Sequence, residues 1–311
     1  MKKFIHNTLF FSFICLCIIG LCELIVRQIP NDYSVKNNLL REKSPHIKIL
    51  CLGNSQIYFG INPIFFNKTA FNAAHVSEPL NMSQFILNKY DTQMDSLENI
   101  IISVSIFTPF VTWEPGGEGE SWRIKHYHLY YDYPIPWYDM NDRFELSNSN
   151  YNTLVRWKKA IVKPNGIVYS DENGFGRNYL QHHPQGWEQC DDAIRTHTTE
   201  NYAASPFVEY NREVLRQIIQ SHPHANIFLL TTPCWHTYTE FVNQGQLQYV
   251  ENFAESLANQ FKNCHYINLF RDGRFVAEDF DDAYHLSEIG AKKMTIILND
   301  TICCLTEKNI D

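Results

Sequence analysis

The chain has 311 residues, of which 44% are hydrophobic and 19% are charged. This composition can build a sizeable core, and it excludes disordered, collagen-like and polytopic membrane proteins. The 26 Lys and Arg residues stand against 34 Asp and Glu residues, a net charge of −8, so we expect no nucleic-acid partner.

The first segment predicts a membrane anchor. Lys2 and Lys3 precede an uncharged and largely apolar run from Phe4 to Cys22, and about 20 such residues span a bilayer as a helix. The lysines favour a cytoplasmic N-terminus, and no small-x-small cleavage site follows the run. We expect residues 1–27 to form an uncleaved single-pass anchor in a bacterial inner membrane, with a cleaved signal peptide as the alternative. The remaining chain is then periplasmic or otherwise extracytoplasmic.

After the anchor, a polar stretch with two prolines (28–45) predicts a juxtamembrane linker. Apolar runs of strand length then alternate with helix-like stretches. The expected strands are 47–52, 100–104, 227–230 and 265–269, and the expected helices are 78–94, 206–220, 241–261 and 287–305. This alternation predicts an α/β domain over residues 46–305, with a parallel sheet between two layers of helices. Active sites in such sheets form at the carboxyl ends of the strands.

Residues 107–205 interrupt this rhythm, because they are rich in proline and glycine and lack a clean periodicity. The stretch is too long for a plain loop, so we interpret it as an insertion beside the sheet. Aromatic rings gather in its first part, and aromatic faces stack on sugar rings. Trp122 and Trp137 are therefore candidates for substrate binding. The alternative is that these rings pack a small core of the insertion itself.

Two short segments carry candidate chemistry. Gly53-Asn54-Ser55 follows directly on the first expected strand, where a serine hydroxyl and nearby backbone N–H groups face the same space. Asp282 and His285 stand three positions apart before the last expected helix, so the carboxylate can hold Nδ1 of the imidazole while Nε2 faces outward. Each segment alone also fits ordinary turn chemistry. Together, and in this order, they predict a catalytic Ser-His-Asp set.

In these segments the chain resembles the SGNH/GDSL hydrolase superfamily, whose first and last sequence blocks are similar to Gly53-Asn54-Ser55 and to residues 282–287. The resemblance covers residues 46–108 and 205–305. With its single anchor and large insertion, the chain looks like the exported branch, which includes alginate O-acetylation proteins and D-alanyl-transfer proteins of teichoic acid synthesis. The resemblance implies an SGNH or flavodoxin-like three-layer fold, a Ser55 nucleophile, a His285 base oriented by Asp282, and a membrane-bound partner in acyl transfer.

The chain departs from the family at the blocks that supply the oxyanion donors. The second block lacks its glycine and reads as residues 71–75, and Ser103-Val104-Ser105 stands where Gly-x-Asn is expected. Asn72 and Ser105 are the candidates that remain near those positions. The missing asparagine favours the reading of a non-catalytic protein that has kept the fold.

Neither a metal nor a cofactor is expected. The nine cysteines show no zinc-ligand spacing, and the short histidine pairs lack carboxylates at a recognised spacing. The sequence therefore predicts an SGNH-type serine esterase or O-acyltransferase, whose partner is an acylated glycan or polysaccharide of the cell envelope or extracellular space. The alternative is a glycan-binding or assembly protein without catalysis.

Overall fold

The computed structural model describes residues 1–113, 121–135, 142–147, 168–177 and 190–307, and the single positions 158 and 162. The described strands are β1 (Ile49–Leu52), β2 (Ala70–Asn72), β3 (Asn99–Ser103), β4 (Asn226–Thr231) and β5 (Cys264–Asn268). The described α-helices are α1 (Lys2–Arg27), α2 (Asp32–Lys43), α3 (Ser55–Gly60), α4 (Leu80–Tyr90), α5 (Ile124–Tyr131), α7 (Asp191–His197), α8 (Phe207–Ser221), α9 (His236–Phe241), α10 (Gln244–Gln260) and α11 (Glu288–Glu307). The chain forms two compact units, residues 1–37 with 122–168, and residues 38–121 with 169–311.

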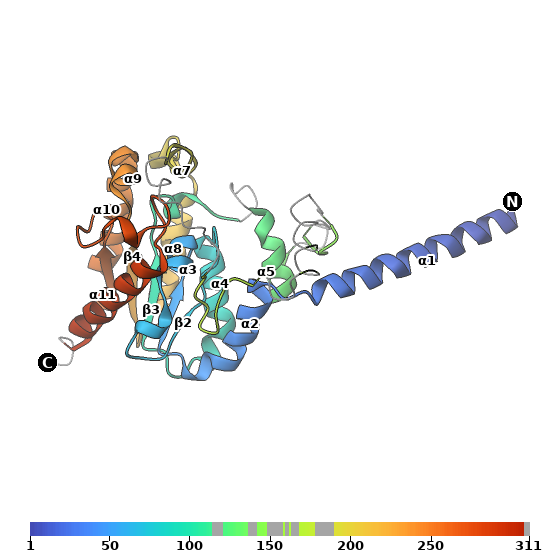
Figure 1. Cartoon of the computed structure of the whole chain (residues 1–311), viewed down its shortest axis with the longest axis horizontal. Coiled ribbons are helices and arrows are strands. Elements are labelled where there is room, and N and C mark those ends of the chain that lie inside the picture. The colour runs from blue at the N-terminus through green and yellow to red at the C-terminus, as the bar shows by residue number, and fades with distance from the viewer. Residues whose placement is uncertain are drawn as a thin grey trace. The chain divides into compact units, whose positions relative to one another are not determined.

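The first unit begins with the apolar helix α1, which Figure 1 shows as one unbroken helix. Its most apolar window has a mean hydropathy of 2.7, and by length and composition it can cross a membrane. Its 26 residues extend roughly 39 Å at 1.5 Å per residue. Near its end Glu23 pairs with Arg27 at 2.6 Å and accepts the N–H groups of Glu145 and Leu146. The polar end of the helix is thereby fixed to the segment 142–147.

The second unit is built on a sheet of five parallel strands in the order β2-β1-β3-β4-β5. This confirms the predicted α/β class. Each of the four predicted strands lies within two residues of an observed strand at both ends. The sequence missed β2, because three residues are too few for a pattern of alternation to show.

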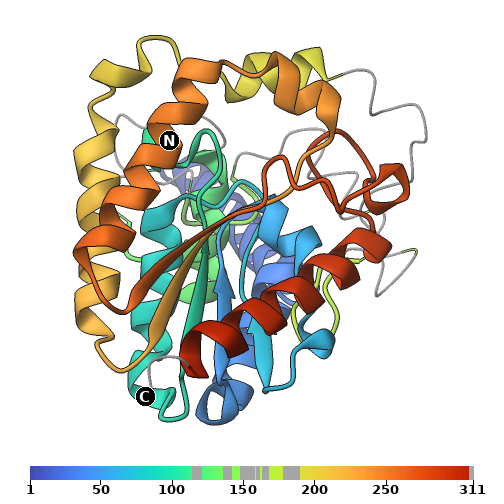
Figure 2. The same cartoon turned by 90° about the vertical axis from the view of Figure 1, so that its left-hand side faces the viewer.

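Every residue of β1 and β3 is buried, which requires cover on both faces of the sheet. On one face α3 and α11 pack together, and Met294 and Leu298 of α11 share a core cluster with Cys51, Ile101 and Phe228 of the sheet. On the other face α4 and α8 pack against each other, with α10 against β5 (Figures 1 and 2). The domain is therefore the predicted three-layer sandwich.

The strand order places a topological switch at the centre of the sheet. From β1 the chain moves outward to β2, and it then returns to the other side of β1 to form β3. The order 2-1-3-4-5 is that of flavodoxin-like folds, and ligands of such folds bind beyond the carboxyl ends of the strands at the switch. The fold therefore predicts a ligand site at the segments that follow β1 and β3.

The segment expected as a linker (28–45) contains the helix α2, in which the apolar side chain of Leu40 is wholly buried. One helical prediction differs from the structure. The expected helix 241–261 is two helices, α9 and α10, which separate at Val242 and Asn243. The side chain of Asn243 accepts the N–H of Gln246 at 3.0 Å and so starts a new helix.

Candidate active site

The turn after β1 depends on a glycine. Gly53 has a φ of +128°, and a Cβ at this position would lie 2.5 Å from Cβ of Ser103 on the neighbouring strand β3. Only glycine combines this conformation with so close an approach. Its N–H donates to the buried carboxylate of Glu78 at 3.3 Å, which holds the turn. The turn at Gly53 thus takes the chain out of the sheet at the carboxyl end of β1, beside the topological switch.

Asn54 then starts helix α3. Its side-chain oxygen accepts the N–H of Gln56 at 3.0 Å, as an N-cap does. Its amide group donates to Oγ of Ser105 at 2.7 Å, which ties the start of α3 to the segment after β3. Ser55 is therefore the first residue of α3, at the carboxyl edge of β1.

A second turn presents the imidazole. One carboxylate oxygen of Asp282 accepts the N–H groups of Tyr284 and His285, at 2.9 and 2.7 Å, and so shapes the turn. The other carboxylate oxygen lies 2.8 Å from Nδ1 of His285. A bridge between Phe280 and Leu286 closes the loop at its base. The Asp282 carboxylate therefore holds both the backbone of this turn and the imidazole ring of His285.

The fold brings the two turns together. Nε2 of His285 lies 2.8 Å from Oγ of Ser55, although the two residues are 230 positions apart. Together with the contact from Asp282 to Nδ1, this forms a continuous relay from carboxylate to imidazole to hydroxyl. In such a relay the imidazole can take the serine proton while the carboxylate stabilises the charge that forms.

The surroundings keep Asp282 charged and His285 shielded. Burial by itself would raise the pKa of Asp282, but the charge and hydrogen bond of His285, together with two backbone N–H groups, hold that pKa below its ordinary value. His285 is 7% exposed, and the ring of Phe59 meets it edge-on at 5.5 Å. The carboxylate is therefore ionised at neutral pH and the imidazole is largely screened from water.

The two oxyanion candidates have no donor to spare. The amide nitrogen of Asn72 donates to the carbonyl oxygens of Ile57 and Ile61, both at 2.8 Å, which uses its two hydrogens to hold α3. The N–H of Ser105 donates to Oγ1 of Thr108 at 2.8 Å, and its hydroxyl donates to Oε1 of Gln56 at 2.5 Å. Both residues therefore use their donors to hold neighbouring backbone and side chains of the site in place.

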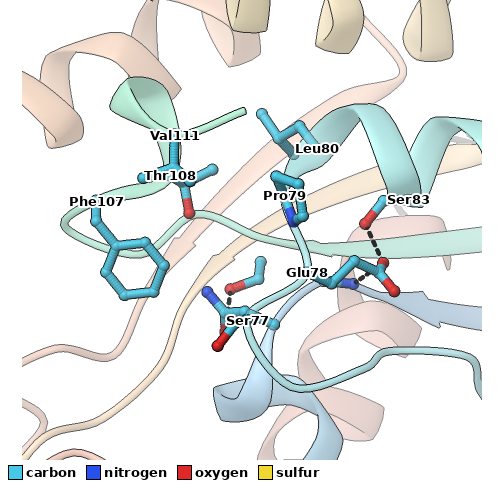
Figure 3. Close-up of a pocket in the computed structure, with 11 residues that line it drawn as sticks. Ser77, Glu78, Pro79, Leu80, Ser83, Phe107, Thr108 and Val111 are labelled. Atoms are coloured by element: carbon cyan, nitrogen blue, oxygen red, sulfur yellow. Dashed lines mark hydrogen bonds between the residues drawn. The ribbon is translucent and has the colours of Figure 1, made fainter. Parts of the chain in front are cut away.

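Two other residues near the turn after β1 have hydrogen-bond donors that are not in use among the described residues. The N–H of Ser55 has no acceptor among the described residues. Ser77, in the loop after β2, has a φ of 59°, which is uncommon outside glycine, and its N–H and hydroxyl likewise have no partner in the described part of the chain. Ser77 lines a small pocket with Gly53, Asn54 and Phe107 (Figure 3). No sequence pattern marks Ser77, because a serine that adopts a left-handed conformation looks like any other serine in the sequence.

The sequence also missed His197, at the end of α7. Its ring meets the ring of Tyr284 at 4.9 Å, and Tyr284 is the direct neighbour of His285. No motif surrounds His197, and it lies in the stretch interpreted as an insertion. Only the fold could place it beside the loop that carries Asp282 and His285.

The candidates for substrate binding were Trp122 and Trp137. Trp122 belongs to the first unit, and its side chain is 49% exposed. The guanidinium of Arg123 lies over its ring at 4.5 Å. Trp137 lies outside the described residues. Among the residues that are described, no group of three His, Cys, Asp or Glu side chains could hold a metal ion.

Comparison with known proteins adds little to this geometry. No family model matches the chain. No curated protein matches it either. Among solved structures, the chain is similar to one from Streptococcus pneumonia that is provisionally described as a platelet activating factor, with 12% sequence identity, a TM-score of 0.41, and coverage of 93% of this chain and 98% of that chain. A likeness this distant assigns neither an activity nor a substrate to this chain.

Proposed function

We propose that the protein is a serine ester hydrolase or O-acyltransferase of the SGNH kind, which acts on an ester of a cell-envelope or extracellular glycan through an acyl-enzyme on Ser55. The observation that carries the proposal is the relay of two 2.8 Å contacts, from Asp282 to Nδ1 of His285 and from Nε2 of His285 to Oγ of Ser55. The relay stands at the carboxyl edge of the sheet, where the blocks of the SGNH resemblance also fall.

In the first half-reaction, Oγ of Ser55 attacks the acyl carbonyl carbon while Nε2 of His285 accepts the hydroxyl proton. The tetrahedral intermediate then collapses, and the alcohol leaves with the proton that His285 returns to it. The acyl group stays on Ser55 as an ester. Asp282 keeps Nδ1 protonated throughout and stabilises the imidazolium that forms at each step.

The negative oxygen of the intermediate needs hydrogen-bond donors. The free N–H of Ser55 is one candidate, and the N–H or hydroxyl of Ser77 is the second, because Ser77 lines the pocket beside Asn54. Donors that are already in place when the charge develops are worth about 3 kcal/mol each in other enzymes. This assignment replaces the donors that the chain lacks relative to the family.

In the second half-reaction, His285 deprotonates the acceptor, which then attacks the acyl carbon. Water as acceptor gives an esterase, and a sugar hydroxyl gives an O-acyltransferase. The same three residues serve both outcomes. We further propose that α1 anchors the domain on the outer face of a bacterial inner membrane, where a membrane-bound acyl-transfer protein is its expected partner.

A second candidate function is a non-catalytic glycan-binding or assembly protein that has kept the fold. The occupied donors of Asn72 and Ser105 favour this alternative, because the family's oxyanion positions are here used for structure. The intact relay favours catalysis, since neither glycan binding nor assembly requires it.

Covalent labelling of Ser55 separates the two candidates. We expect the full-length protein in detergent to react with a fluorophosphonate probe, and Ser55→Ala to lose both labelling and ester turnover, by a factor on the order of 10³ or more. The fold should persist, because a partly exposed turn loses only one oxygen. A Ser55→Ala variant that supports full function in cells would mean that the protein is a binding factor.

A further inference from the structure

His197 joins two of the loops that build the candidate site. Its ring packs against Phe107, from the segment after β3, with ring centres 4.7 Å apart. On another side it meets Tyr284, from the loop that carries Asp282 and His285, at a right angle and 4.9 Å. Its carbonyl oxygen accepts the side-chain amide of Gln246 on α10 at 2.9 Å, which fixes the end of α7. The imidazole is therefore held in place beside the catalytic loop.

The hydrogen-bond partner of Nδ1 determines which ring nitrogen of His197 carries the proton. Nδ1 of His197 lies 2.7 Å from the hydroxyl of Tyr238, a residue that is only 1% exposed. Burial raises the pKa of Tyr238 well above its ordinary value, so the phenol keeps its proton. Nδ1 is the one acceptor for that proton among the described residues, and a buried O–H without an acceptor is costly. Tyr238 therefore donates to Nδ1, and the neutral ring carries its own proton on Nε2.

The Nε2–H group has no partner within the described part of the chain, and Nε2 is not one of the fully buried unpaired atoms there, so this edge of the partly buried ring keeps some contact with solvent. Burial, with the nearby charge of His285, lowers the pKa of His197 to about 4, so the ring is neutral at physiological pH. The result is a fixed neutral donor beside the aromatic rings of Tyr284 and Phe107. A directed polar group next to aromatic faces is the combination that binds sugars.

We propose that the Nε2–H group of His197 donates a hydrogen bond to an oxygen of the sugar whose ester is processed at Ser55. His197 is then a specificity residue, which favours sugar esters, with their many acceptor oxygens, over simple aryl esters. This inference rests on the proposed function for its substrate class, whereas its structural basis, the tautomer fixed by Tyr238, is independent of catalysis.

Two substitutions of His197 distinguish the role of Nδ1, which accepts from Tyr238, from the role of the Nε2–H donor. In His197→Asn the side-chain oxygen stands near the position of Nδ1, so Tyr238 keeps its acceptor while the outer donor is lost. In His197→Gln the amide nitrogen reaches the position of Nε2, so the outer donor is kept. The control is His224→Asn, which changes an exposed histidine at the opposite, amino-terminal end of β4.

The test uses full-length Ser55→Ala in detergent, so that binding is measured without turnover, and penta-O-acetylglucose as the probe. We expect added His197→Asn to raise the Kd about three- to tenfold, the loss of one neutral hydrogen bond. Added His197→Gln should bring the Kd back close to that of Ser55→Ala alone, and His224→Asn should leave it unchanged. Equal Kd values for the His197→Asn and parent proteins, or no binding of the sugar at all, would overturn the inference.

The tautomer has its own readout. The ¹⁵N chemical shifts of the His197 ring should show the proton on Nε2 near pH 7, and Tyr238→Phe should abolish this preference. A proton on Nδ1 in the parent protein would also overturn the inference. Failure of the proposed function is recognised separately, because it appears as absence of ester turnover and of fluorophosphonate labelling in the unsubstituted protein.

Discussion

At the scale of single residues, the charge of Asp282 is the most direct lever on the candidate site. Asp282→Asn keeps the size of the side chain but removes the charge that stabilises the imidazolium, and its amide favours the wrong tautomer of His285. We expect kcat to fall on the order of 10³ to 10⁴. Hydrolysis of 4-nitrophenyl acetate measures the change. Asp192→Asn, at an exposed position on α7, is the control and should retain full activity.

A second prediction at this scale concerns His197 and the dependence of stability on pH. Its pKa is about 4 in the folded protein, against 6.5 for an ordinary histidine, because burial and the charge of His285 disfavour the protonated ring. Between these values the unfolded chain binds a proton that the folded chain does not, so stability falls as the pH falls from 6.5 towards 4. We expect His197 to account for a loss on the order of 3 kcal/mol over that window.

Urea unfolding at pH 7 and at pH 4.5 measures this effect. His197→Asn keeps the partner of Tyr238 but cannot be protonated, so its free energy of unfolding should change less between the two pH values than that of the parent. His224→Asn should behave like the parent. An identical loss in His197→Asn and the parent would show that other groups cause the acid sensitivity.

At the scale of elements, the start of α11 supports the loop that carries Asp282 and His285. Ser287 caps this helix, because its hydroxyl accepts the N–H of Gly290 at 3.2 Å. A Cβ on Gly290 would lie 2.0 Å from the carbonyl oxygen of Asp279, just ahead of the loop. The glycine lets the helix pack directly against the backbone there.

We therefore expect Gly290→Ala to lower the free energy of unfolding by about 1–3 kcal/mol, because helix and loop must move apart. The same movement should displace His285 from Ser55 and reduce fluorophosphonate labelling. Gly273→Ala is the matched control, since a Cβ there meets nothing within 4 Å. If Gly290→Ala unfolds and reacts like the parent, the loop is not held by this contact.

At the scale of the whole molecule, we expect α1 to attach the α/β domain to the membrane and to place that domain outside the cytoplasm. Lys2 and Lys3 favour retention of the N-terminus in the cytoplasm, and the helix is long and apolar enough to span a membrane. Protease added to spheroplasts should remove the domain, and the protein should stay with the membrane at its full-length mass. Complete protection from protease would contradict this topology, and a shortened, released chain would indicate a cleaved signal.

The sequence by itself determined the class of fold. Apolar runs such as 100–104 and 227–230 alternate with amphipathic stretches, and that pattern is local, so it can be read without coordinates. The same holds for Gly53, Asp282 and Ser287, whose turn and cap chemistry is written in neighbouring residues. The sequence also singled out Ser55 and His285 as partners, through order and resemblance, although their roles stay predictions.

Only the tertiary structure decided which atoms meet. It brought Ser55 and His285 to 2.8 Å, and it occupied every donor of Asn72 and Ser105, which no spacing could reveal. It also placed His197 beside Tyr284 and gave its Nδ1 a partner in Tyr238. Secondary structure follows from residues a few positions apart, so the class of fold could be predicted from the sequence. Hydrogen-bond partners and burial arise between segments far apart in the chain, so the free and occupied donors of the site could not.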